Sequence, residues 1–233
     1  NADAMLACAG DKSLLFSASG RSFLMFRRHG TSCIALFDPV GEPDERAELI
    51  WRFREICDRE RVRPAFYLVR PDDLRLYADV GLTVTRLGDA ARVPLNDFVL
   101  DDPANSRMRF GFNRGAREGL SFRLLLPEEV PPVTDTLAAI SRAWLIARQG
   151  REPGFSTAPF STGYIRRFEV AIALSGEEIV AFAVVLRAAS GDEAAFDALR
   201  WQPHAPASTL EYLTVATMLE LQARGVTVLS IGM

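Results

Sequence analysis

The longest unbroken apolar run in the chain is Ile179–Leu186, which holds eight residues. A helix that crosses a bilayer needs about 20 apolar residues, so no segment of this sequence is predicted to span a membrane. Turn residues at Ser175-Gly176 and Ser190-Gly191 flank the run, which indicates a strand. The whole chain has 233 residues, 48% of them hydrophobic and 24% charged, which is typical of one large or two small globular domains.

The remaining pattern predicts two series of strands and helices. In the first series the order is strand, strand, strand, helix, strand, helix, strand, over residues 13–17, 23–26, 33–37, 49–57, 65–69, 74–78 and 82–87. In the second series the order is strand, helix, strand, strand, strand, helix, strand, over residues 120–126, 133–144, 170–174, 179–186, 194–199, 210–221 and 226–231. Apolar residues at helical spacing mark the helices, and short apolar runs between glycine turns mark the strands.

A basic helix is expected between the two series. Asp101, Asp102 and Pro103 are typical of a helix start, and Gly119 ends the segment. The sequence therefore predicts a mixed α/β protein with a leader or tag at residues 1–9, a first unit at 10–100, a basic linker helix at 101–119 and a second unit at 120–233.

Charge and metal-ligand content exclude several function classes. The net charge is −3, whereas a dedicated duplex-DNA binder is usually strongly basic, so we expect no DNA partner. The three cysteines, Cys8, Cys33 and Cys57, have the spacings 25 and 24, which fit no metal motif. With only two histidines, a multi-histidine metal centre is not expected.

Six phrases in this order carry a resemblance to a known family. They are Gly10-Asp11-Lys12-Ser13-Leu14-Leu15-Phe16-Ser17 with Asp38-Pro39-Val40-Gly41, Asn113-Arg114-Gly115-Ala116-Arg117-Glu118-Gly119, Gly154-Phe155-Ser156, Val180-Ala181-Phe182-Ala183 with Asp197-Ala198-Leu199-Arg200, Leu210-Glu211-Tyr212-Leu213, and Ile231-Gly232-Met233. Over residues 10–233 the chain resembles the C-terminal domain of the phosphatidylglycerol lysyltransferases and alanyl-phosphatidylglycerol synthases.

The resemblance implies a fold, a reaction and its partners. The fold would be a tandem of GNAT (acetyltransferase-like) folds joined by the basic helix. The reaction would move lysine or alanine from aminoacyl-tRNA to a hydroxyl of phosphatidylglycerol, with aminoacyl-tRNA as co-substrate and no cofactor. The domain would work at the inner face of the bacterial cell membrane, in a protein that carries a membrane domain upstream.

The chain departs from the family pattern in three places. The family usually has Asp-Leu-Met-Arg where this chain has Asp197-Ala198-Leu199-Arg200, and often Met-Asp where it has Leu210-Glu211. The family also continues beyond Gly-Met, where this sequence stops at Met233. The charged positions are retained in the first two cases, but the choice between lysine and alanine stays open.

Three residues are predicted to be catalytic. The ester of an aminoacyl-tRNA is already activated, so the enzyme must position a hydroxyl, help to remove its proton and stabilise an oxyanion. Asp197 could orient or deprotonate the hydroxyl, Arg200 could bind the lipid phosphate, and Glu211 could serve as a base. In a regular strand Asp197 and Arg200 would point to opposite faces.

A second group is predicted to bind substrate. The arginines of residues 106–118 would form a cationic face for tRNA phosphates or anionic lipid heads, Asn113 and Glu118 would position or cap, and Ser156 would hold the donor amino acid. The predicted binding residues are Arg107, Arg109, Asn113, Arg114, Arg117, Glu118, Phe155, Ser156 and Tyr212.

Three alternatives remain open. An acetyl-CoA transferase needs a glycine-rich loop for the CoA pyrophosphate, but the sequence has no glycine between Gly191 and Gly225. A lipid- or tRNA-binding module without catalysis would not need the charged residues Asp197, Arg200 and Glu211. A transferase that uses a peptide acceptor cannot be separated from a lipid-directed enzyme by the residues alone.

Overall fold

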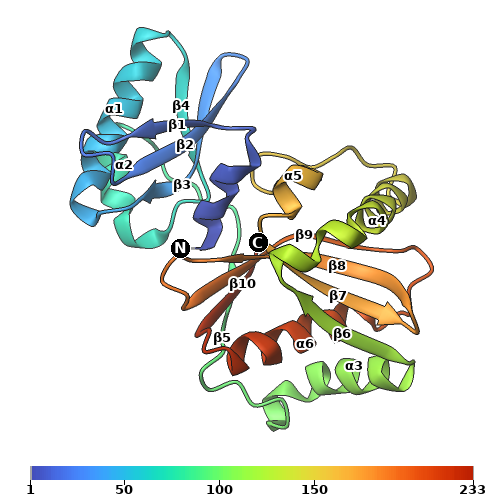
Figure 1. Ribbon diagram of the computed structural model, residues 1–233. Coiled ribbons are helices and arrows are strands. Elements are labelled where there is room, and N and C mark those ends of the chain that lie inside the picture. Colours follow the sequence, from blue (N-terminus) through green and yellow to red (C-terminus); the bar gives the residue numbers. More distant parts are fainter. Residues whose placement is uncertain (1, 233) are drawn as a thin grey trace. The chain divides into compact units, whose positions relative to one another are not determined.

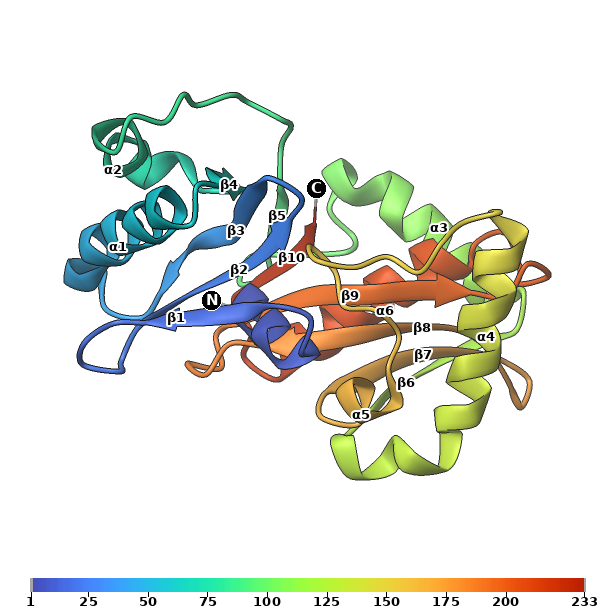
Figure 2. The ribbon, with the colours of Figure 1, turned by 90° about the horizontal axis from the view of Figure 1, so that it is seen from above.

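The computed structural model describes residues 2–232 and divides them into two compact units. The N-terminal unit consists of residues 6–89 and 154–156, and the C-terminal unit of residues 2–5, 90–153 and 157–232. Each unit is built around its own sheet, as the two views in Figures 1 and 2 show. None of the helices in residues 2–232 combines the length and the apolar character that crossing a bilayer requires.

The N-terminal unit contains a four-stranded sheet in the order β1-β2-β3-β4. Its strands are β1 (Ser13–Phe16), β2 (Phe23–His29), β3 (Ser32–Val40) and β4 (Arg63–Tyr67). The first three form the predicted antiparallel meander, and β4 is parallel to β3. Its helices are α1 (Arg46–Arg59) and α2 (Leu74–Asp79), with short 3-10 helices η2 (Pro43–Glu45) and η3 (Pro71–Asp73).

The core of this unit follows from the helical spacing in α1. Leu49, Phe53 and Cys57 are buried on one face of that helix, as predicted. Phe53 packs with Leu24 of β2 and Cys33 of β3 against the sheet. A 3-10 helix, η1 (Ala2–Ala9), comes before β1 in the stretch that the sequence suggests is a leader.

The C-terminal unit contains a six-stranded sheet in the order β5-β10-β9-β8-β7-β6. Its strands are β5 (Ala91–Pro94), β6 (Leu120–Leu125), β7 (Glu169–Ser175), β8 (Glu178–Arg187), β9 (Glu193–Trp201) and β10 (Val228–Gly232). All neighbours are antiparallel except β9 and β10, which run parallel over residues 193–195 and 228–230. The apolar run Ile179–Leu186 lies within β8, where every one of its residues is buried.

Helices cover both faces of this sheet. They are α3 (Ser106–Arg117), α4 (Thr134–Ala147), α5 (Thr162–Ile165) and α6 (Thr209–Ala223), with 3-10 turns η4 (Pro103–Asn105), η5 (Pro127–Glu129) and η6 (Pro131–Val133). Helices α3 and α6 lie on one face and α4 and α5 on the other (Figure 1). The sheet is therefore the middle layer, which explains why β8 is apolar without alternation.

The sequence predictions fail at three elements. The strand predicted at residues 82–87 is wrong, because residues 82–90 have no regular structure. The next four residues form β5 instead, a strand with one half-buried apolar side chain, Val93, that pairs with β10. Neither β5 nor the four-residue helix α5 has the periodicity that makes a strand or helix recognisable.

Two glycines allow α3 and α6 to approach closely. A Cβ atom added to Gly111 would lie 2.8 Å from the Cβ of Glu211, and one added to Gly115 would lie 2.7 Å from the Cβ of Tyr212. Both glycines are buried and lie one helical turn apart, so they form a flat strip against which α6 packs. Beside this strip the rings of Phe112 and Tyr212 stack with their centroids 5.1 Å apart.

We predict that Gly115→Ala destabilises the protein. Alanine favours a helix by about 1 kcal/mol over glycine, but overpacking against Tyr212 costs about 1–3 kcal/mol. Chemical denaturation should show a lower free energy of unfolding. The control is Gly163→Ala in α5, where an added Cβ meets only Ser161 Oγ at 3.8 Å. Equal stability of both variants would contradict the close helix contact.

Candidate active site

A bulge in β9 places Asp197 and Arg200 on the same face of the sheet. Val184 of β8 pairs with Asp197 and Phe182 pairs with Arg200, so a step of two residues in β8 matches a step of three in β9. The extra residue lies at Ala198, whose φ of 48° is left-handed. The condition for opposite faces, a regular strand, is therefore not met, because β9 continues past both residues to Trp201 and contains a bulge between them.

Asp197 is buried and accepts hydrogen bonds from three groups. The Thr157 hydroxyl donates to Oδ1, the backbone N–H of Ala158 lies 3.1 Å from the same atom, and the Tyr164 hydroxyl lies 3.0 Å from Oδ2. Its side chain is only 6% exposed. These bonds satisfy the buried carboxylate oxygens and fix the segment that leads into α5.

Arg200 is also buried, and only 2% of its surface is exposed. Its guanidinium donates to Ser141 Oγ of α4 and to both carboxylate oxygens of Glu152, one of them at 3.1 Å. The guanidinium carbon lies 5.3 Å from the ring centroid of Trp144 and 5.8 Å from that of Phe160. The arginine thus links α4 to the segment that begins at Glu152 and is stabilised by charge and ring contacts.

Asp197 and Arg200 therefore hold one stretch of chain between them. This stretch, residues 152–160, connects α4 to α5. Asp197 and Arg200 bind its residues Glu152, Thr157 and Ala158, whereas residues 154–156 belong to the N-terminal unit. Glu152 also accepts a hydrogen bond from the backbone N–H of Phe160, which closes the ends of the stretch on each other. We call residues 152–160 the connecting segment.

The structure places Glu211 and Tyr212 on the other side of the sheet. Glu211 is exposed in the first turn of α6, and its Cβ faces Gly111 of α3. Tyr212 is buried against α3, and burial raises the pKa of its hydroxyl. Of the predicted catalytic residues, Asp197 and Arg200 are brought together, whereas Glu211 is not part of their network.

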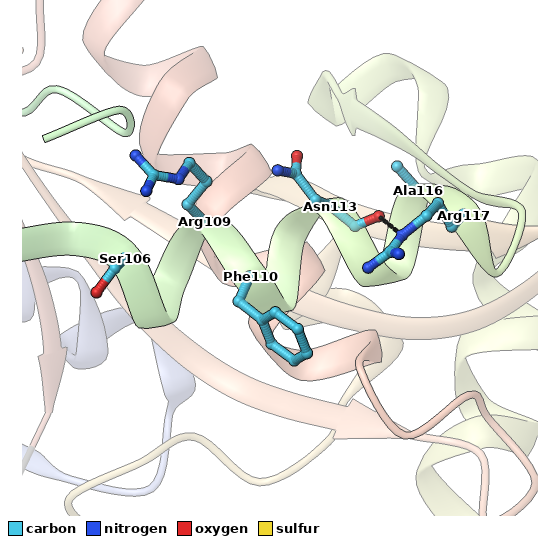
Figure 3. Close-up of a pocket in the computed structure, with 6 residues that line it drawn as sticks. All are labelled: Ser106, Arg109, Phe110, Asn113, Ala116 and Arg117. Atoms are coloured by element: carbon cyan, nitrogen blue, oxygen red, sulfur yellow. Dashed lines mark hydrogen bonds between the residues drawn. The ribbon is translucent and has the colours of Figure 1, made fainter. Parts of the chain in front are cut away.

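The predicted basic helix is present as α3, and its cationic side chains are largely exposed. Arg109 donates to the carbonyl of Asp101 at 2.6 Å, Arg114 to Glu118 at 2.8 Å and Arg117 to the carbonyl of Asn113 at 3.3 Å. An open hollow of about 690 Å³ lies along this helix. Figure 3 labels the six residues that line it, which are Ser106, Arg109, Phe110, Asn113, Ala116 and Arg117.

Glu118 connects the end of α3 to the turn before α6. Its carboxylate accepts from the hydroxyl of Ser208, which with the guanidinium of Arg114 lowers the pKa of Glu118. Ser208 immediately precedes α6. Glu118 therefore links the end of α3 to the start of α6.

Phe155 and Ser156 belong to the N-terminal unit. The backbone N–H of Phe155 donates to Asp11 at 3.1 Å, and its ring lies 6.3 Å from that of Tyr67. Asp11 forms an ion pair at 2.6 Å with Lys12, whose side chain is fully buried. The φ of Phe155 is 72°, an uncommon value for an aromatic residue, so these contacts hold a strained backbone.

Sequence reasoning missed the residues that bind Asp197 and Arg200. Ser141, Glu152, Thr157 and Tyr164 lie 33 to 59 residues away along the chain. Serine, threonine and glutamate are common surface residues, so nothing in their local sequence marked them. Only the buried charge of Asp197 and Arg200 could have indicated that partners must exist.

The fold is found in known acyltransferase-like proteins. A tandem GNAT protein from the clavulanic acid biosynthesis pathway aligns over 98% of this chain and 78% of its own, with a TM-score of 0.52 and 13% identity. At that identity the likeness shows the fold alone. The mixed sheets and the tandem alignment define the class as a GNAT-like α/β protein, as predicted.

The chain belongs to the phosphatidylglycerol lysyltransferase C-terminal family, whose profile matches residues 1–233. It is 36% identical to the C-terminal domain of a lysylphosphatidylglycerol synthetase from Agrobacterium fabrum, with a TM-score of 0.97 over 100% of this chain and 74% of that one. It is 30% identical over 234 residues to the phosphatidylglycerol lysyltransferase of Bacillus subtilis. It spans 27% of the length of that relative.

We predict that Glu152→Gln weakens the fold around Arg200. Burial raises the pKa of Glu152, but hydrogen bonds from Arg200 and from the N–H of Phe160 outweigh it, so the pKa is lowered overall. Loss of the carboxylate leaves a buried guanidinium short of its partner, which costs about 1–3 kcal/mol. Denaturant unfolding at neutral pH should show this loss, while Glu128→Gln, at an exposed carboxylate, should not.

The same pair makes stability depend on pH. A carboxyl whose pKa is lowered in the folded protein stabilises it fully above the ordinary value of about 4.3. This contribution is lost as the pH falls through the lowered pKa of the folded state. The wild type should therefore lose more stability than Glu152→Gln between neutral and acid pH, and parallel pH profiles would contradict the ion pair.

Proposed function

We propose that this chain is the catalytic part of an enzyme that moves an amino acid from aminoacyl-tRNA to a hydroxyl of phosphatidylglycerol. The observation that carries the proposal is the family match over residues 1–233. The Bacillus subtilis relative is a phosphatidylglycerol lysyltransferase, so lysine is the first donor amino acid to test and alanine the second. The domain would act at the inner face of the cell membrane, in a longer protein with a membrane domain.

The proposed reaction is a transesterification. The lipid hydroxyl oxygen attacks the carbonyl carbon of the aminoacyl ester, the bond from that carbon to the tRNA ribose oxygen breaks, and the hydroxyl proton ends on the ribose oxygen. The reaction requires positioning, proton transfer and stabilisation of the tetrahedral oxyanion. The donor is activated already, so no cofactor enters the proposal.

The roles proposed for the site residues follow from their contacts. Asp197 and Arg200 are positioning residues, because their polar atoms bind the connecting segment and α4. Glu211 is the accessible carboxylate among the predicted catalytic residues and is the proposed base. The arginines of α3 supply positive charge for phosphate groups, and Ser156 is proposed to contact the donor amino acid.

The reaction is tested by mixing the protein with tRNA charged with labelled lysine or alanine and with phosphatidylglycerol vesicles. We expect the extracted lipid to carry label from one of the two amino acids. Deacylated tRNA and phosphatidylcholine vesicles are the controls. A folded protein that labels phosphatidylglycerol with neither amino acid would overturn the proposal.

We predict that Asp197→Asn retains more than a tenth of the transfer rate. The amide oxygen still accepts from the N–H of Ala158 and from the hydroxyl of Thr157, and the amide nitrogen donates to the hydroxyl oxygen of Tyr164 in place of accepting from it. Loss of a general base would instead lower the rate by about 10²–10⁴-fold. The comparison is with Asp197→Ala, which removes all three bonds, and with Glu211→Gln, which should show the larger loss in kcat.

A further inference from the structure

The outer face of α3 carries an exposed phenyl ring among arginines. Phe110 is 62% exposed, although a ring of this size is usually buried. It lies at helical spacing with Ser106, Asn113 and Arg117, and these four line the hollow in Figure 3. We call this strip of α3 the outer face.

The opposite side of α3 fixes the ring in place. Gly111 and Gly115 are buried against Glu211 and Tyr212 of α6, so the helix cannot rotate to cover Phe110. The exposure of the phenyl ring is therefore a property of the packed helix. An apolar ring held in this way is available to a partner.

The charge around the ring is positive. Arg107, Arg109, Arg114 and Arg117 occur within one helix that contains no acidic residue. Arg109 and Arg114 pair with Asp101 and Glu118, but within residues 2–232 Arg107 and Arg117 form no ion pair with a carboxylate. Neither guanidinium group is neutralised by a carboxylate, so both can bind anions, although Arg117 also donates to the carbonyl of Asn113.

We infer that the outer face of α3 docks the protein on an anionic phospholipid bilayer, with Phe110 inserted among the lipids and the arginines on their phosphates. Amphipathic helices bind membranes in this way, through an apolar side chain and flanking cations. Each arginine near an anionic surface contributes about 1 kcal/mol. The inference rests on the proposed function, which puts the acceptor lipid in such a bilayer.

A bilayer fits this face better than RNA does. The base-paired acceptor stem of a tRNA presents phosphates and 2′-hydroxyls, and its bases are stacked inside the helix. The paired stem has no exposed base on which the phenyl ring could stack. The unpaired 3′ end of the tRNA has such bases, but in the proposed reaction it carries the amino acid to the reacting groups and not to this face. A bilayer uses both the charge and the ring.

The test measures binding to vesicles by flotation. The vesicles are made of phosphatidylglycerol with phosphatidylcholine, or of phosphatidylcholine alone, and the protein is the full 233-residue chain. Phe110→Ser and the double variant Arg107→Gln/Arg117→Gln should each bind the anionic vesicles about tenfold more weakly. The matched control is Ile146→Ser, which removes a 77% exposed apolar side chain from α4 on the other face of the sheet.

Three results would overturn the inference. Wild-type binding by Phe110→Ser would show that the ring does not insert. An equal loss in Ile146→Ser would show that any exposed apolar side chain matters. Loss of tRNA binding by the arginine variant, with vesicle binding unchanged, would make the outer face an RNA surface.

A soluble acceptor separates docking from chemistry. With short-chain phosphatidylglycerol below its micelle concentration, Phe110→Ser should transfer amino acid as well as the wild type, while on vesicles its rate should fall about tenfold. Equal losses on both acceptors would contradict a docking role. If the wild type transfers to neither acceptor, the proposed function fails, and vesicle flotation still decides the docking.

Discussion

The bulge at Ala198 is the constraint on which the arrangement of the C-terminal unit depends. A non-glycine residue in the left-handed region costs about 1–3 kcal/mol, so something must hold it there. The hydrogen bonds of Asp197 and Arg200 provide that stabilisation, because both side chains reach their partners only if β9 contains the extra residue. Loss of the bulge would therefore disrupt β9, the connecting segment and the attachment of α4 at the same time.

Close packing and charge occupy opposite sides of the same helix. The glycines of α3 bring it against α6, and this contact fixes the backbone that carries Glu211 as well as the exposed face with Phe110. A longer side chain at Gly111 would move both. The packing of two helices thus sets the position of a proposed base and of a proposed membrane contact at once.

Sequence periodicity predicted most elements of both units, because apolar spacing reports directly which face of a helix or strand is buried. It could not predict β5, whose only half-buried apolar residue is Val93. It also could not predict the bulge, since Ala198 carries no turn signal, nor the partners of Arg200, which come from segments far along the chain. The candidate site residues were predicted through the resemblance, and the structure adds the groups that surround them.

The anchors of the connecting segment come after it in the chain, and this order has a consequence for folding during synthesis. Residues 152–160 leave the ribosome before Asp197 and Arg200 exist, so the hydrogen bonds between the segment and these two residues form only once β9 has paired with β8. Contacts between segments 39 to 48 residues apart also close large loops, which is slow. Until then we expect the segment to be open to proteases in the nascent protein.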